Sequence, residues 1–125
     1  MAVADISQDA QLELSCRQVP DGQAVITMRG ELDIATAGEA YSYIRDVLDR
    51  RRGPITLDVT GLTFCDASGL GVLARLAAQA RRAGRRLSLT GARPPLVRIM
   101  RITGMDSAFP GLRAPALSMV VLALC

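Results

Sequence analysis

The hydrophobic residues of this chain follow two different periods, and the order in which these periods alternate restricts the fold. Residues 12–16 and 24–28 place apolar side chains at every second position, as in half-buried strands, and the turn signal "PDGQ" separates the two runs. From Ala35 the apolar positions fall three and four residues apart, as on one face of a helix. Gly53 and Pro54 end this helical pattern.

Strands and helices then alternate. The run "ITLDV" predicts a short buried strand, and the helical pattern that begins near Ser68 ends at Gly84. "RLSLT" predicts the next strand. Pro94 and Pro95 favour the start of a further helix, which we expect to end at Gly104.

Two more elements are expected after this point: a short edge strand within "MDSAFPGLR" and a last apolar helix from Pro115. The whole order predicts the α/β fold class, with a single mixed, mostly parallel β-sheet, an N-terminal antiparallel hairpin, and helices packed against the sheet. The chain has 125 residues, half of them hydrophobic, which suits one domain spanning residues 1–125.

The composition argues against most enzymatic chemistry. The sequence has no histidine, lysine, tryptophan or asparagine. Without histidine there is no Ser-His-Asp nucleophile and no ordinary zinc site, and without lysine there is no phosphate-loop lysine and no Schiff base. We therefore expect a protein that is not an enzyme and that holds no metal and no cofactor.

The charge pattern does not favour nucleic-acid binding. Fifteen arginines are interleaved with twelve acids, for a formal net charge of +3, and there are only two Phe and two Tyr to stack on bases. The densest basic runs, "RDVLDRRRG" and "ARRAGRR", fall where helices should end, and cations suit the dipole there.

The cysteines and the two ends of the chain indicate a compartment. Cys16, Cys65 and Cys125 are widely spaced and form no metal or redox motif, which favours a reducing compartment. No signal peptide opens the sequence, and the apolar run "ALSMVVLALC" is about half the length needed to cross a bilayer. We expect a cytoplasmic protein without membrane insertion.

One stretch, "TFCDASGLGVL", combines an acid at the end of a strand with a glycine-rich helix start. Asp66 should cap the helix by accepting a hydrogen bond from the amide of Ser68 or Gly69. Gly69 and Gly71 each cost about 0.5 to 1 kcal/mol relative to alanine. That cost favours a bare helix start, which the backbone of a partner can approach closely. "GELD" follows the second strand and should lie at the same edge of the sheet.

"GELD" after an edge hairpin, "ITLDV", "LTFCDASGLGVL" and "RIMRITGM" together resemble the bacterial anti-sigma factor antagonists, which have the STAS fold. The resemblance spans roughly residues 10–124. It implies a protein that binds an anti-sigma factor, usually also a serine kinase, and so frees a sigma factor for transcription. It further implies a monomer or a weak dimer.

The resemblance also assigns residues. Asp33 matches the acid that ends the family's Gly-Glu-Leu-Asp motif, Asp66 matches the acid that opens the second turn, and Gly69 matches its glycine. The implied partner-binding residues are Asp33, Thr36, Asp66, Ala67, Ser68, Gly69 and Leu70.

One position departs from the family's pattern. In the phosphorylated members the acceptor usually follows the acid directly, and here that place is Ala67. Ser68 matches the second hydroxyl residue of the motif and is the remaining candidate phosphoacceptor. The departure argues against regulatory phosphorylation while leaving antagonist function in place.

Three alternative interpretations bear on particular residues. Asp58, near the end of a central strand, could imitate the phosphoacceptor of a receiver domain, but that chemistry needs a lysine. The STAS fold could instead serve as a cytoplasmic subunit that docks on a membrane transporter, through the apolar "ALSMVVLALC". Cys65 is either a redox sensor or a small core residue; the adjacent carboxylate of Asp66 should raise the pKa of its thiol, which favours the core.

Overall fold

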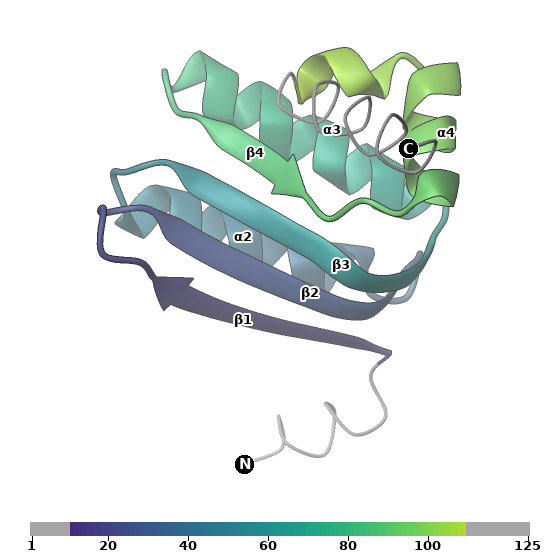
Figure 1. Ribbon diagram of the computed structural model, residues 1–125, viewed down its shortest axis with the longest axis horizontal. Coiled ribbons are helices and arrows are strands. Elements are labelled where there is room, and N and C mark those ends of the chain that lie inside the picture. Colours follow the sequence, from purple (N-terminus) through teal and green to yellow (C-terminus); the bar gives the residue numbers. More distant parts are fainter. Residues whose placement is uncertain (1–10, 110–125) are drawn as a thin grey trace, which may run out of the picture.

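The computed structural model describes residues 11–109, in which strands and helices alternate along the chain (Figure 1). The elements are, in order, β1 (Leu12–Gln18), β2 (Ala24–Leu32), α2 (Ala37–Arg50), β3 (Ile55–Cys65), α3 (Ala67–Arg82), β4 (Leu87–Thr90), α4 (Pro94–Ile102) and the short 3₁₀ helix η1 (Met105–Ala108).

The four strands form one sheet in the order β1-β2-β3-β4. β1 and β2 are an antiparallel hairpin in which Leu12 lies opposite Gly30 and Gln18 lies opposite Ala24. β3 runs parallel to both β2 and β4. The predicted fold class, a mixed and mostly parallel sheet with an N-terminal antiparallel hairpin at its edge, is therefore confirmed.

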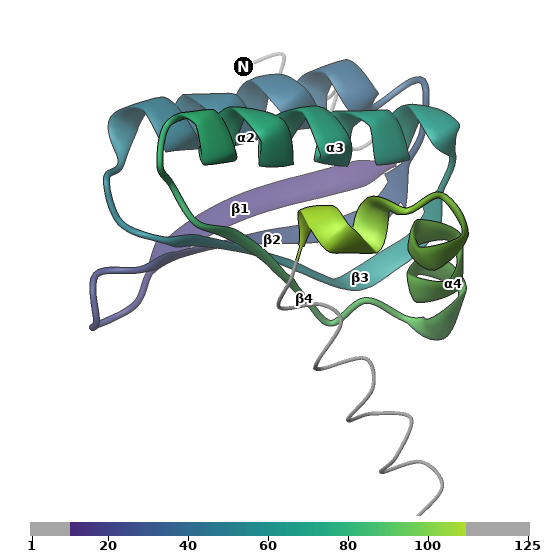
Figure 2. The same ribbon diagram turned by 90° about the horizontal axis from the view of Figure 1, so that it is seen from above.

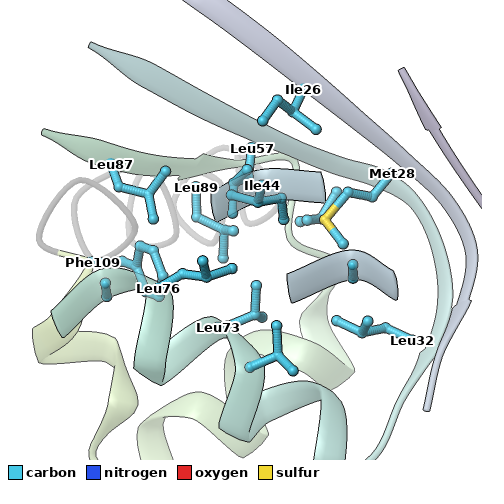
Figure 3. Close-up of a cluster of buried hydrophobic side chains, with 14 of the residues drawn as sticks. Ile26, Met28, Leu32, Ile44, Leu57, Leu73, Leu76, Leu87, Leu89 and Phe109 are labelled. Atoms are coloured by element: carbon cyan, nitrogen blue, oxygen red, sulfur yellow. The ribbon is translucent and has the colours of Figure 1, made fainter. Parts of the chain in front are cut away.

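Helices α2 and α3 lie side by side over the same face of the sheet (Figure 2). Every second residue of β2, from Ala24 to Met28, is buried beneath them, as are Ile55, Leu57 and Val59 of β3. Helical spacing supplies the matching residues: Ala40, Ile44, Val47 and Leu48 from α2, and Leu73, Leu76, Ala77 and Ala80 from α3. The core in Figure 3 lies between these two layers and is closed by Phe109. The alternation in the strands and the three-and-four spacing in the helices thus give the sheet and the helix layer one apolar face each, and these two faces pack together.

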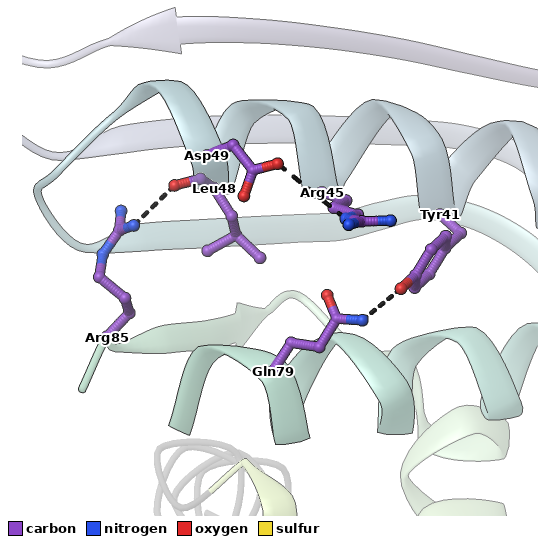
Figure 4. A network of polar contacts seen from close by, with 6 residues as sticks. All are labelled: Tyr41, Arg45, Leu48, Asp49, Gln79 and Arg85. Atoms are coloured by element: carbon purple, nitrogen blue, oxygen red, sulfur yellow. Dashed lines mark hydrogen bonds and ion pairs between the residues drawn. The ribbon is translucent and has the colours of Figure 1, made fainter. Parts of the chain in front are cut away.

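The two helices are also joined by polar contacts at their exposed seam (Figure 4). Gln79 of α3 donates a hydrogen bond from its side-chain amide to the hydroxyl of Tyr41 on α2. The guanidinium of Arg75 lies 4.1 Å from the centre of the Tyr41 ring, within range of a cation–π contact. The hydrogen bond from Gln79 is the main reason why the pKa of Tyr41 falls below its ordinary value.

Strand β3 is longer than the sequence predicts, since it continues from "ITLDV" to Cys65. The register explains the error. β3 has an extra residue relative to β2 at two places, between the pairs Thr27–Asp58 and Arg29–Gly61, and again before Glu31–Phe64. Each bulge shifts the inward-facing positions by one residue, so the alternation that marks a strand is lost while the strand itself continues.

The region after α4 differs from the prediction too. Residues 105–108, for which we expected part of an edge strand, form the 3₁₀ helix η1. The rest of that expected strand, and the helix predicted from Pro115, lie outside the described residues.

Candidate functional site

The loop after β2 and the start of the helix after β3 meet at one edge of the sheet. Both strands are parallel, so their carboxyl ends lie together. The backbone N–H of Asp66 donates a hydrogen bond to the carbonyl oxygen of Leu32, at 3.2 Å. This bond joins the two segments that sequence analysis selected, "GELD" and "CDASGL", into a single surface.

The loop after β2 is fixed by a reciprocal pair, Asp33 and Thr36. One carboxylate oxygen of Asp33 accepts hydrogen bonds from the N–H groups of Ala35 and Thr36, at 3.0 and 3.1 Å. The hydroxyl of Thr36 accepts from the N–H of Asp33 at 3.0 Å and donates to the carbonyl of Glu31 at 2.9 Å. These bonds hold Ile34 at the tip of the loop, where 80% of its surface is exposed.

Asp66 is the N-cap of α3, as predicted. Its Oδ1 accepts a hydrogen bond from the N–H of Gly69 at 3.1 Å, while its carbonyl accepts from the N–H of Leu70 at 2.9 Å. Of the two amides considered from the sequence, Ser68 and Gly69, the structure selects the second. The cap satisfies a donor that the first turn would otherwise leave unpaired.

The first turn of α3 presents Ala67 and Ser68 outward. Ala67 is exposed and Ser68 is half-exposed. The hydroxyl of Ser68 makes no hydrogen bond to any other described residue, so it is free to react or to be bound. Asp66 precedes Ser68 by two residues, and Asp33 follows Leu32, whose carbonyl accepts the N–H of Asp66; both acidic residues are half-exposed.

Three of the predicted site residues lie behind this surface. Thr36 is only 4% exposed, and Gly69 and Leu70 are also buried. These three residues hold the loop and the helix start in place, and the outer surface consists of Asp33, Asp66, Ala67 and Ser68.

The two glycines of α3 have different environments. A Cβ at position 69 would lie 2.6 Å from the carbonyl oxygen of Leu32 and 2.9 Å from the sulfur of Cys65, whereas a Cβ at position 71 would meet nothing within 4 Å. The close approach inferred from the sequence is real at Gly69, but it is an approach to the chain's own β2 strand. Only Gly71 leaves the helix surface bare toward solvent.

Cys65 lies at the end of β3, half-buried against the hydrophobic core. Burial raises the pKa of its thiol to about 11, and the neighbouring carboxylate of Asp66 adds to the shift. A thiol that stays protonated is a poor nucleophile. The structure thus favours the core interpretation of Cys65.

Next to Cys65 is a groove of about 360 Å³ that sequence analysis did not find. Leu62, Phe64 and Cys65 of β3 form one wall, and Leu96 and Ile99 of α4 form the other. Phe64, one of the two phenylalanines in the chain, leaves half of the surface of its large apolar side chain exposed. No sequence pattern indicated either exposed residue of the groove: Ile99 lies within a run of residues predicted only to be helical, and the bulges hide the course of β3 around Phe64.

Each helix within residues 11–109 is too short or too polar to span a bilayer. No group of three or more cysteine, aspartate or glutamate side chains there is arranged to hold a metal ion.

This architecture is similar to that of known proteins. Residues 9–118 match a family model described as "Mlab, STAS domain". A solved anti-sigma factor antagonist from Mycobacterium paratuberculosis has 25% sequence identity and a TM-score of 0.67, over 79% of this chain and 83% of its own.

Two other solved structures share the fold at lower identity. The Bacillus cell fate determinant SpoIIAA, solved in its phosphorylated form, has 19% identity and a TM-score of 0.62, over 78% of this chain and 88% of its own. A sulfate transporter family protein from Wolinella succinogenes has 21% identity and a TM-score of 0.65, over 78% and 79%.

The glycine environments give a matched pair of substitutions. We expect Gly69→Ala to lower the free energy of unfolding by about 1 to 3 kcal/mol, because the new methyl group collides with backbone. We expect Gly71→Ala to raise it by about 0.5 to 1 kcal/mol, because alanine favours an exposed helix interior. Urea unfolding followed by circular dichroism measures both. Equal effects at the two positions would contradict this description.

The raised thiol pKa predicts the pH dependence of Cys65 alkylation. In a Cys16→Ser, Cys125→Ser variant, the rate with iodoacetamide should keep rising about tenfold per pH unit up to about pH 10, whereas an ordinary thiol levels off near pH 9. Asp66→Asn should move the curve to lower pH, since it removes the smaller of the two causes. A plateau below pH 9 in the folded protein would show that Cys65 is not buried in this way.

Proposed function

The chain belongs to the STAS domain family, and we propose that it is an anti-sigma factor antagonist: it binds an anti-sigma factor of the serine kinase type and so frees a sigma factor for transcription. The observation that carries the proposal is the single surface made by the loop after β2 and the first turn of α3, joined by the bond between Asp66 and Leu32. The antagonist from Mycobacterium paratuberculosis, similar over most of both chains, supports it.

This surface suits binding better than catalysis. Its functional groups are two carboxylates and one hydroxyl that makes no hydrogen bond within residues 11–109. No histidine or lysine occurs anywhere in the chain to act as a base near neutral pH. Its frame is rigid, because the Asp33–Thr36 pair and the Asp66 cap hold the backbone. Rigid loops lose little entropy when a partner docks, which favours affinity.

We further propose that the surface has an apolar margin that the sequence did not indicate. Ile34 is exposed at the tip of the loop after β2, and Phe64 and Ile99 border the groove beside Cys65. Exposed aromatic and aliphatic side chains next to a polar centre are the arrangement that supplies hydrophobic contact in protein interfaces. In this proposal the anti-sigma factor covers both the acidic centre and this margin.

The control of such a complex depends on position 67. A phosphate adds about −1.5 to −2 charges. Beside Asp66 and the loop of Asp33, that charge would oppose desolvation against a partner, at a cost of several kcal/mol. Ala67 has no hydroxyl to accept it, and we propose that the antagonist acts as a titrant, removed by competition or degradation.

The transporter alternative remains a second candidate, because the fold also occurs in the sulfate transporter family protein from Wolinella succinogenes. The segment that sequence analysis assigned to that docking, "ALSMVVLALC", lies outside the described residues. Co-purification from the native cell separates the two functions. A kinase-like anti-sigma factor supports the proposal, and a membrane permease supports the alternative.

The acidic centre predicts the effect of reversing charge. Asp33→Arg and Asp66→Arg should each weaken the complex with the anti-sigma factor by about tenfold or more. Each change removes a carboxylate that pairs with the partner and brings an arginine against the partner's positive group, which costs at least about 1.4 kcal/mol of binding free energy. Isothermal titration calorimetry measures the dissociation constants.

Two further variants make that test specific. Asp66→Asn keeps the N-cap while removing the charge, so it separates lost stability from lost binding. Asp21→Arg, in the hairpin turn at the opposite end of the sheet, makes the same charge change away from the surface and should bind normally. Normal binding by both Asp33→Arg and Asp66→Arg would show that the partner docks elsewhere.

The exposed methyl group of Ala67 predicts the outcome of a kinase reaction. After incubation with the cognate kinase and ATP, intact-mass measurement should find a phosphate on Ala67→Ser but none on the wild-type chain. The Ser68 side chain is rotated by about 100° around the helix axis relative to that of Ala67, so it is misaligned for a kinase active site that fits position 67. A phosphate on the wild type that disappears in Ser68→Ala would instead make Ser68 the regulatory residue.

A further inference from the structure

The end of the sheet opposite the proposed docking surface is rich in arginine. Three arginines, Arg50 to Arg52, stand where α2 leads into β3, and four more, Arg81, Arg82, Arg85 and Arg86, stand where α3 leads into β4. Figure 2 shows that both connections lie at the same end of the molecule. Nothing in the proposed function uses this end.

Arg85 joins the two connections. Its guanidinium donates to the carbonyl of Leu48 at 2.7 Å, as drawn in Figure 4, and to the carbonyl of Gly53 at 2.9 Å. The N–H of Ile55 adds a bond to the carbonyl of Arg86 at 3.0 Å. The two arginine runs are therefore neighbours in space, although about thirty residues of chain separate them.

The positive charge at this end exceeds what the local structure needs. The carboxyl end of each helix offers about −0.5 charge. Arg50 is paired with Asp46 at 2.8 Å, and Arg51 bonds the side chain of Gln18. Within residues 11–109, Arg81, Arg82 and Arg86 have no acidic partner. Helix dipoles alone therefore do not account for the number of arginines.

Three of these arginines surround a hollow of about 270 Å³. Arg81, Arg85 and Arg86 line it together with small apolar side chains, among them Ala77, Ala80 and Leu87. The Nε of Arg85 is buried and has no hydrogen-bond partner within the described part of the chain. A buried donor without a partner is uncommon in folded proteins, and this one belongs to a residue that lines the hollow.

We propose that this hollow binds a phosphate group. A carboxylate is satisfied by one guanidinium fork, whereas a phosphate has enough oxygens to accept from several arginines at once. The alanine and leucine walls suit a short apolar portion attached to that phosphate. The phosphate belongs either to a soluble phosphorylated compound or to the headgroup of an anionic lipid, and both present the same chemistry to the three arginines.

The test uses inorganic pyrophosphate as the soluble probe, titrated into the ¹⁵N-labelled full chain at constant ionic strength. Amide shifts should concentrate around residues 80–87 and at Gly53. Arg81→Ala and Arg86→Ala should each weaken binding by about tenfold, the value of one charge-assisted hydrogen bond. Arg85 is left unchanged, because its bonds to Leu48 and Gly53 hold the fold.

Arg82→Ala is the matched control. It removes the same charge from the same connection, but Arg82 does not line the hollow, so binding should stay within about twofold if the pocket and not diffuse charge is responsible. The side chains of Arg81, Arg82 and Arg86 make no hydrogen bond or ion pair to other described residues, so all three variants should fold, and circular dichroism checks this.

A second arm separates the two sources of phosphate. Vesicles of phosphatidylglycerol in phosphatidylcholine are compared with vesicles of phosphatidylcholine alone. If the protein binds the anionic vesicles, and if Arg81→Ala and Arg86→Ala reduce that binding more than Arg82→Ala does, the site belongs to a lipid headgroup. If the protein binds pyrophosphate but not the vesicles, the site belongs to a soluble compound. Failure of both probes, or equal effects of all three variants, overturns the proposal. The docking surface lies at the other end of the sheet, so this outcome is independent of the antagonist function.

Discussion

The contact between the end of β2 and the first turn of α3 determines how the candidate surface is built. The carbonyl oxygen of Leu32 accepts the N–H of Asp66, and the same oxygen lies 2.6 Å from the point that a Cβ at position 69 would occupy. Only glycine allows the helix to start this close to the strand. Because the helix starts there, the Asp66 cap and the loop of Asp33 share one edge of the sheet.

Much of this arrangement can be predicted from local sequence rules. Apolar spacing located α2 and α3, and the turn signals located the hairpin, because these features depend only on neighbouring residues. The Asp66 cap was predicted for the same reason, since a short polar side chain three residues before an unpaired amide has few other uses. The raised thiol pKa of Cys65 also followed from its neighbours, as burial and an adjacent carboxylate act in the same direction.

What the sequence did not reveal depends on contacts between distant segments. The length of β3 was underestimated because its bulges are defined against β2, which no local pattern records. The sequence analysis attributed Gly69 to the close approach of a partner's backbone, whereas the backbone that comes close is that of Leu32. The sequence does not tell which backbone approaches a glycine. The groove beside Phe64 needs β3 and α4 to be positioned together, and the joining of the two arginine runs by Arg85 needs α2 and β4 as well.

The separation between buried and exposed residues at the candidate surface has a consequence for how such a protein can change over generations. The frame is made by residues that face inward, Leu32, Thr36 and Gly69, whereas Ile34, Ala67 and Gly71 face solvent and touch little of the chain. Substitutions of the second kind alter what a partner meets without disturbing the fold. A duplicated copy of this chain could therefore acquire a new binding specificity through a few surface replacements, with each intermediate still folded.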